Sequence, residues 1–487
     1  MAETRRRTFT DYFGLAKKQH ELDFVDIPLD GDTPLFIDPY AISKRKDLWS
    51  IRCHNQIVAY FQAVVDSIIN GDTEKAKYLL SGLKEPNEIG FGLSKGVVSR
   101  GRGIGREQSG WLYNALVDSS AVKTGFIKDI EDCELLIEGI DKDKISDMTT
   151  NIIKNRLIEY TQRQCDLQGI KTQEVSSGLI WNEKTEKWES EYTRLPVCDG
   201  RKRILIPKAI ARHGTEFNYR EYYQHFVLNF LQQEEFKANS SLVRTLKDGT
   251  KKEPTKKSLM EKYPLKKSFL YDFSKDHQAV LSDYKVSKSK GIKEISDDKL
   301  NSLTGNEEDD GAYDLLKHEL DEIPSGTDDA AAFHDLIKGI LTAIFHPLLT
   351  NPTKEQGIHE GRKRIDITYT NSAKEGFFSE LLANKGVPAG YVFVECKNYS
   401  ADPSNPELDQ LAGRFSHKRG RFGLLVCRTI DNKILFEKRC KDTAQDDRGY
   451  ILALDDHDIK ELLDLKANNQ ISLINKFLDD RFKKLVM

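Results

Sequence analysis

Two short segments in the C-terminal third of the chain carry the residue types that hydrolyse phosphodiester bonds with a metal ion. Asp366 lies in the run Arg-Ile-Asp-Ile-Thr, and Glu395 and Lys397 lie two positions apart in Val-Glu-Cys-Lys. Alternation of apolar and polar residues predicts a strand in each segment, and the period of two places Glu395 and Lys397 on one face. If the strands pair, Asp366 and Glu395 converge on one divalent cation, because carboxylate oxygens suit Mg²⁺.

The chemistry expected of such a group is metal-assisted hydrolysis. The metal would lower the pKa of a bound water and polarise the ester, and Lys397 would offset the charge that develops on the attacked phosphate. The Glu-x-Lys pair alone also fits an ordinary charged strand end, since 31% of the residues are charged. The surrounding elements therefore decide between these interpretations.

Those elements follow a regular order along the chain. An apolar stripe at helical spacing predicts a helix over residues 329–346, followed by the Asp366 strand and, after a polar excursion, by the Glu395 strand. A second helix is predicted to begin at Pro406 with Asn405 as its cap, and its Gln410 and Arg414 share one side at a spacing of four. A further apolar strand is expected at residues 422–427.

This order resembles the PD-(D/E)xK nuclease superfamily, and most closely its Mrr-like restriction-endonuclease branch. The resemblance lies in the motifs Arg364-Ile-Asp-Ile, Val394-Glu-Cys-Lys-Asn, Leu408-Asp-Gln-Leu-Ala-Gly and Gly423-Leu-Leu-Val. It covers about residues 325–455 and implies an α/β fold, a restriction-endonuclease-like mixed sheet flanked by helices. By the same resemblance Asp366 and Glu395 would bind Mg²⁺ or Mn²⁺, Lys397 would be the catalytic lysine, and Gln410 would support the site or the DNA.

Two positions depart from the family pattern. Ile365 replaces the usual proline before the first aspartate, and His334 stands where members often carry a glutamate in the leading helix. A histidine at the edge of an apolar stripe is more typical of a boundary residue than of a ligand. Further candidates for a metal ligand are His334 itself and, in the loop before the first strand, Glu355 and Glu360, so the number of metal ions stays open.

Basic residues gather around the expected site. Lysines and arginines in this number can position a phosphate backbone without reading base sequence. The candidates for nucleic-acid contact are Arg362, Lys363, Arg364, Arg414, Lys418, Arg419 and Arg421.

The length of 487 residues predicts two or three domains. We expect a mostly helical α+β N-terminal domain with a sensing or regulatory role over residues 1–235, a charged helical linker region over 236–325, and the nuclease domain over 326–487.

Two further basic stretches leave alternatives open. The glycine-rich segment at residues 90–106 lacks the spacing of a Walker loop, so it is a surface loop or a contact for nucleic acid or nucleotide. The lysine-rich tract at 247–267 is either a solvated face or a contact for a nucleic-acid backbone. Because the net charge is only −3, such contacts must come from local patches.

The composition points to a cytoplasmic protein without a membrane span. No apolar run approaches the roughly 20 residues that cross a bilayer, and the first residues lack the apolar core of a signal peptide. Seven dispersed cysteines with no Cys-x-x-Cys pair are expected to be reduced. Amphipathic helices in residues 456–487 could cap the sheet or form a homo-oligomer contact.

The function expected from these features is a metal-dependent endonuclease that hydrolyses DNA, set by the resemblance in bacterial antiphage defence or restriction. Alternatives are a non-catalytic DNA-binding or assembly subunit with a degraded nuclease fold, and an RNase or DNA-repair nuclease on the same fold. The lack of a Walker loop argues against an intrinsic ATP motor, so a partner ATPase, helicase or other defence subunit is possible.

Overall fold

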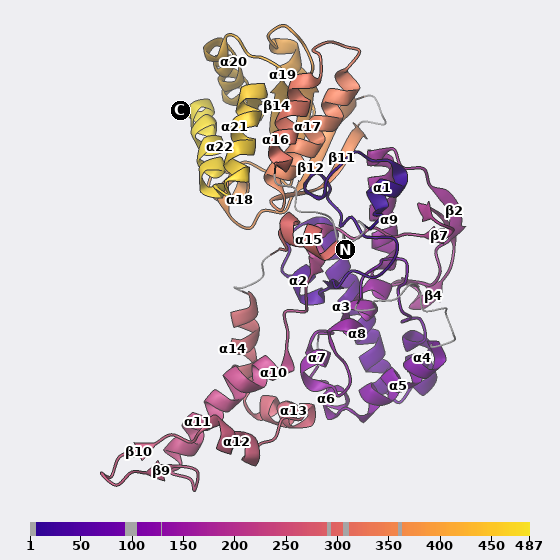
Figure 1. Ribbon diagram of the computed structural model, residues 1–487, viewed down its shortest axis with the longest axis vertical. Helices are drawn as coiled ribbons and strands as arrows, with labels where there is room; N and C mark the ends of the chain where they lie inside the picture. The colour runs from indigo at the N-terminus through magenta and orange to yellow at the C-terminus, as the bar shows by residue number, and fades with distance from the viewer. Residues whose placement is uncertain (1–5, 93–104, 128, 290–293, 305–310, 359–362) are drawn as a thin grey trace, which may run out of the picture.

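Apolar side chains pack into two separate cores, which define an N-terminal and a C-terminal body (Figure 1). The computed structural model describes residues 6–92, 105–127, 129–289, 294–304, 311–358 and 363–487, without the side chains of 105–109, 355–358 and 363–365. The first core runs from Phe9 to Leu300 and the second from Leu316 to Leu485. The boundary therefore lies between residues 300 and 316, whereas the sequence suggested boundaries at 235 and 325.

A five-stranded mixed sheet forms the centre of the C-terminal body. The first three strands pair antiparallel and the last three pair parallel. In spatial order the strands are β11 (Leu349–Ile358), β12 (Lys363–Asn371), β13 (Tyr391–Lys397), β14 (Phe422–Cys427) and β15 (Tyr450–Leu454). Every residue of β14 is buried, as expected of a parallel strand covered on both faces. The predicted mixed sheet of an α/β domain is confirmed.

Helices flank this sheet in two packed groups. One group contains α16 (Ala312–Glu322), α17 (Ala330–Phe345) and α21 (Asp456–Ala467), which contact one another. The other contains α18 (Gly376–Ala383), α19 (Asn405–Ala412), α20 (Lys433–Gln445) and α22 (Ile471–Val486). The leading helix α17 agrees with its prediction to within one residue at each end. It ends before Pro347, whose ring cannot continue a helix.

The start of α19 differs from the sequence prediction by one position. Ser404, not Asn405, is the N-cap: its backbone N–H and its hydroxyl both donate to the carboxylate of Glu407, at 2.8 and 3.2 Å. Pro406 lies in the first turn, where its missing N–H removes no bond.

The N-terminal body is mostly helical, with short strand pairs. Its helices are α1 (Phe9–Phe13), η1 (Gln19–Glu21), α2 (Pro39–Ser43), α3 (Leu48–Ile69), α4 (Thr73–Leu80), α5 (Gly105–Asp118), α6 (Ser120–Lys123), α7 (Asp132–Leu136), α8 (Lys142–Ile152), α9 (Lys154–Gln168), η2 (Lys208–Ile210) and α15 (Asp297–Thr304). Its antiparallel pairs are β1 (Phe36–Ile37) with β8 (Ala211–Arg212), β2 (Gln173–Ser176) with β5 (Tyr192–Leu195), β3 (Ile180–Asn182) with β4 (Lys187–Glu189), and β6 (Val197–Cys198) with β7 (Arg201–Lys202).

The segment of residues 219–289, which spans the end of the predicted N-terminal domain and the first part of the predicted linker region, folds onto this body and projects from it. It contains α10 (Tyr219–Tyr222), the π-helical turn η3 (Tyr223–Val227), α11 (Leu228–Lys237), β9 (Arg244–Thr245), β10 (Lys251–Lys252), α12 (Lys256–Lys262), α13 (Lys267–Asp276) and α14 (Gln278–Ser289). Its buried residues, such as Leu259 and Tyr284, join the N-terminal core. We call residues 228–262 the arm; its hairpin of β9 and β10 lies at the far end from the body (Figure 1).

The two bodies are joined by buried polar contacts. Asp23 accepts a hydrogen bond from the backbone N–H of Asn351 at the start of β11 (3.1 Å). Lys338 of α17 donates to the carbonyl of Leu167 in α9 (3.2 Å). All seven cysteines are buried free thiols, and in the described part of the chain no helix has the length and apolarity of a bilayer span.

Candidate active site

The register of two neighbouring strands brings the predicted carboxylates together. β12 and β13 pair antiparallel through Ile367 and Val394, so Asp366, one residue before Ile367, and Glu395, one residue after Val394, occupy opposite positions on the two strands. The Asp366 carboxylate accepts a hydrogen bond from the backbone N–H of Cys396 (2.9 Å). The predicted pairing of the two strands is thus present in the structure.

Glu395 is fully buried, and three side chains bind its carboxylate. Gln410 donates to Oε1 (2.5 Å), the Lys397 ammonium lies 2.9 Å from the same oxygen, and Arg414 donates to Oε2. An ionised carboxylate without solvent is costly unless opposite charges and hydrogen bonds surround it. The three side chains supply the hydrogen bonds and positive charge that a buried carboxylate requires.

Helix α19 positions two of these three side chains. Leu408 and Leu411 are buried beneath the sheet strands, so the helix is held in place while Gln410 reaches Glu395 from its last turn. Arg414 follows the helix end at the predicted spacing of four. Burial lowers the pKa of Arg414 from its ordinary value, and the nearby Asp366 charge acts in the opposite direction.

Arg414 serves the site differently from the sequence prediction. It was expected on the surface as a phosphate contact, but it is 4% exposed and its guanidinium is bonded to Glu395. Sequence reasoning noted the shared face of Gln410 and Arg414 and named Glu395, but it did not predict the contact between Arg414 and Glu395. The signal available was that spacing, next to two buried leucines.

His334 is held by the backbone of β13. Its Nε2 lies 3.1 Å from the carbonyl oxygen of Cys396, so this ring nitrogen donates when it carries the proton. The histidine thereby fixes the start of α17 against β13. This contact agrees with the interpretation as a boundary residue and leaves only Nδ1 for another partner.

Of the other predicted residues, three are described by the structure, and five lie outside the described residues or side chains. Lys418 is exposed, and half-buried Arg419 donates to the Arg414 carbonyl (3.1 Å), while Arg421 pairs with Asp447 (2.7 Å). Outside the described residues or side chains lie Glu355, Glu360, Arg362, Lys363 and Arg364.

The donor set fits a hard divalent cation. Two carboxylates, Asp366 and Glu395, lie on adjacent strands, and among the described residues only Oδ2 of Asp366 is engaged. Glu395 already attracts positive charge, which Lys397 and Arg414 supply here. Mg²⁺ or Mn²⁺ would be held by Asp366 and Glu395, with its other positions left for water and phosphate.

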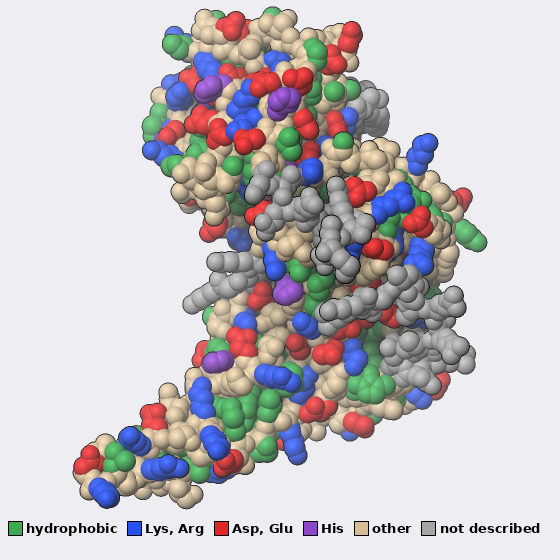
Figure 2. All heavy atoms as spheres, viewed as in Figure 1, with side chains coloured by type: hydrophobic (Ala, Val, Ile, Leu, Met, Phe, Trp, Pro, Cys, Tyr) green, Lys and Arg blue, Asp and Glu red, His purple; other side chains and the backbone are tan. Residues whose placement is uncertain are grey.

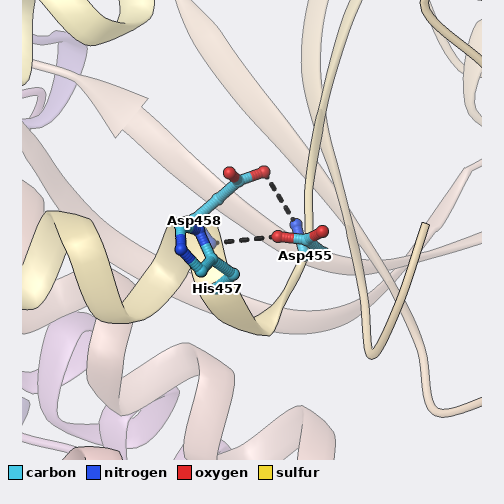
Figure 3. Close-up of side chains that lie close together, drawn as sticks. All are labelled: Asp455, His457 and Asp458. Carbon is cyan, nitrogen blue, oxygen red and sulfur yellow. Dashed lines mark hydrogen bonds between the residues drawn. The ribbon is translucent and has the colours of Figure 1, made fainter. Parts of the chain in front are cut away.

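A second acidic group, which the sequence analysis did not single out, lies at the start of α21 (Figure 3). Ligand atoms of Asp455, His457 and Asp458 lie within 4.8 Å of one another. Asp455 and Asp458 form a capping box, each accepting from the other's backbone N–H. Lys433 lies 2.8 Å from Asp455, and Arg481 lies 2.5 Å from Asp458. Both carboxylates therefore already have structural partners.

The fold and site together define an α/β protein with two bodies, the second of which carries paired carboxylates and a lysine at the edge between β12 and β13. A family model described as a domain of unknown function (DUF8370) matches residues 14–218, within the N-terminal body. No curated protein matches the chain, and no solved structure matches it.

Proposed function

We propose that the C-terminal body is a metal-dependent endonuclease of the restriction-endonuclease-like type that hydrolyses DNA phosphodiester bonds. The observation that carries the proposal is the placement of Asp366 across from Glu395, with Lys397 and Gln410 on the Glu395 carboxylate. These residues come from three motifs of the resemblance: Asp366 from the first, Glu395 and Lys397 from the second, and Gln410 from the third.

Each side chain has a distinct part in the proposed reaction. Asp366 and Glu395 hold the metal, which when bound makes water more acidic and polarises the phosphate. Lys397, whose side chain is only 12% exposed, orients the attacking water and offsets charge on the phosphate oxygens. Gln410 accepts from Lys397 (3.2 Å) while it donates to Glu395, so it fixes the position of both.

The test is cleavage of plasmid DNA by the full chain with Mg²⁺ or Mn²⁺. Lys397→Ala and Asp366→Asn are each expected to lower the nicking rate at least about 100-fold, as loss of a group that stabilises transition-state charge does. Lys438→Ala is the matched control, because Lys438 is an exposed lysine of the same body. Equal nicking by wild type and Lys397→Ala would remove the basis of the proposal.

A non-catalytic DNA-binding subunit is the second candidate. Two observations favour it: His334 replaces an acid that related nucleases often carry, and Lys397 and Arg414 already neutralise Glu395. Such a subunit would bind DNA in EDTA and leave it intact when metal returns. Competition between DNA and RNA substrates separates the RNase alternative.

The proposed setting is bacterial defence against phage or restriction of foreign DNA, with the N-terminal body as the part that senses or restrains. The N-terminal body contacts β11 and α17 directly, and His334 of α17 contacts the backbone of β13. This chain of contacts connects the N-terminal body to the strand that carries Glu395 and Lys397, which supports the division.

A further inference from the structure

The arm ends in an isolated, fully exposed hairpin. The strands β9 and β10 pair only with each other, and every residue from 244 to 253 is exposed. Gly249, with a φ of 84°, closes the turn, and Leu246 and Thr250 are joined by a backbone hydrogen bond of 2.8 Å. A two-stranded hairpin without packing is only marginally stable in water, so this tip is not maintained by a core of its own.

The tip carries positive charge without compensating ion pairs. Its ten residues include four cations (Arg244, Lys247, Lys251 and Lys252) and two acids (Asp248 and Glu253). None of the four cations has a carboxylate partner among the described residues, and the Asp248 carboxylate instead accepts from the Thr250 N–H (2.9 Å). Figure 2 shows blue side chains gathered at this end of the molecule.

The register places like charges opposite each other. Lys252 is the direct cross-strand partner of Arg244, and like charges in this position destabilise a hairpin. Scattered surface lysines that keep a protein soluble need no such pairing. The arrangement costs stability in the free protein, and a bound polyanion would offset that cost.

The root of the arm, in contrast, is neutralised and fixed. Glu235 pairs with Lys262 (2.5 Å) and Gln232 donates to the Pro254 carbonyl (2.7 Å), while the rings of Phe230 and Phe273 pack edge to face. The hairpin is therefore carried on a base that is stabilised independently of its tip.

We infer that the arm tip is a second nucleic-acid contact, which binds the phosphate backbone of duplex DNA at a distance from the cleavage site. The choice of DNA rests on the proposed function of the C-terminal body. Single-stranded nucleic acid is bound through aromatic side chains on which bases stack, and residues 244–253 contain no aromatic residue. Lysine and arginine without aromatic neighbours match the phosphates of a duplex.

The test is binding of a fluorescein-labelled DNA duplex by the full chain, followed by anisotropy in EDTA so that no cleavage takes place. Each phosphate contact contributes about −0.9 to the slope of log K against log salt concentration. The variant Arg244→Gln/Lys252→Gln should therefore lower the steepness of the slope by about 1.8. If the wild type and the variant bind equally well in about 1 M salt, this difference in slope makes the affinity of the variant about 30-fold lower in about 150 mM salt.

The hairpin of β3 and β4 supplies the matched control. Lys184 and Lys187 are exposed there, among the acids Glu183, Glu186 and Glu189, so Lys184→Gln/Lys187→Gln should change neither slope nor affinity. Thermal unfolding is the second readout. Because the arm variant removes a pair of like charges, it should unfold at the same or a higher temperature while it binds DNA more weakly.

The outcomes separate this inference from the proposed function. If the wild type binds duplex DNA and Arg244→Gln/Lys252→Gln has the same salt slope, the arm contact alone is overturned. Equal losses in the arm and control variants overturn it as well, as does tighter binding of a single strand than of the duplex. Nicking of plasmid by the wild type is a separate measurement, so failure of the nuclease proposal is seen independently.

Discussion

Replacing Arg414 by methionine tests whether the buried acid of the candidate site depends on it. The change keeps a long side chain but removes the guanidinium from Glu395, which is fully buried. Removing one partner of a buried ion pair typically costs about 3–5 kcal/mol, because the other charge loses its compensation. Lys397 and Gln410 remain on Glu395, so we expect a loss near about 3 kcal/mol at the lower end of that range.

The loss should be confined to the C-terminal body, and the chain allows this to be measured. All four tryptophans, Trp49, Trp111, Trp181 and Trp188, lie in the N-terminal body, so tryptophan fluorescence follows its unfolding while circular dichroism follows the whole chain. For a body of this size, about 3 kcal/mol corresponds to a shift of about 6–12 °C. We expect that shift in the dichroism transition and a smaller one in fluorescence.

Two variants control this experiment. Adding Glu395→Gln to Arg414→Met removes the uncompensated charge and should recover more than half of the lost stability. Arg448→Met removes an arginine from an ion pair with Asp409 that is exposed on both sides, which is worth at most about 1 kcal/mol. The reasoning is refuted if the double variant is as unstable as Arg414→Met alone, because the cost would then not come from the Glu395 charge.

Two further predictions concern stability. A Cβ on Gly420, whose φ is 147°, would lie 2.5 Å from the Tyr391 carbonyl oxygen. Gly420→Ala should therefore lower the C-terminal unfolding temperature by at least several degrees, whereas Gly390→Ala, with no atom nearer than 3.9 Å, should be nearly neutral. Burial raises the pKa of Asp23 and Asp38 to about 6, so the folded state holds these protons more tightly than the unfolded state. Their stabilising effect is complete below about pH 4 and is lost as the pH rises through about 6. Fluorescence-detected unfolding should accordingly shift to lower temperature between about pH 4.5 and 7.5, and Asp23→Asn should flatten this dependence; an unchanged pH profile in that variant would contradict the assignment.

Periodicity along the chain was sufficient to predict the elements that carry the site. The alternation around Asp366 and Glu395 and the apolar stripe of residues 330–345 each reflect one buried face, and burial of that face is a local property. The pairing of the two strands could also be proposed, since it is the arrangement in which both acids meet. These parts of the prediction agree with the structure.

The features that were missed depend on contacts between distant segments. Arginine is rarely buried, so the spacing of Gln410 and Arg414 alone was not enough to predict that Arg414 turns inward to Glu395 on β13. Residues 236–325 were predicted as a charged helical linker region because their charges obscure the few apolar residues, such as Leu259, Leu270 and Tyr284, that join the N-terminal core. Likewise, the partner of His334 is a backbone carbonyl on β13, which no spacing in the leading helix can reveal.

The charge of Glu395 links the proposed chemistry to the stability of the fold. Two cations, Lys397 and Arg414, stabilise a carboxylate that has no contact with solvent. A divalent cation between Asp366 and Glu395 would bring positive charge to the same oxygens and compete with those side chains. Lys397, released from Glu395, could then face the phosphate, while Arg414 on the other oxygen continues to hold the acid in place. In this arrangement the binding of metal and the availability of the catalytic lysine are coupled through a single buried carboxylate.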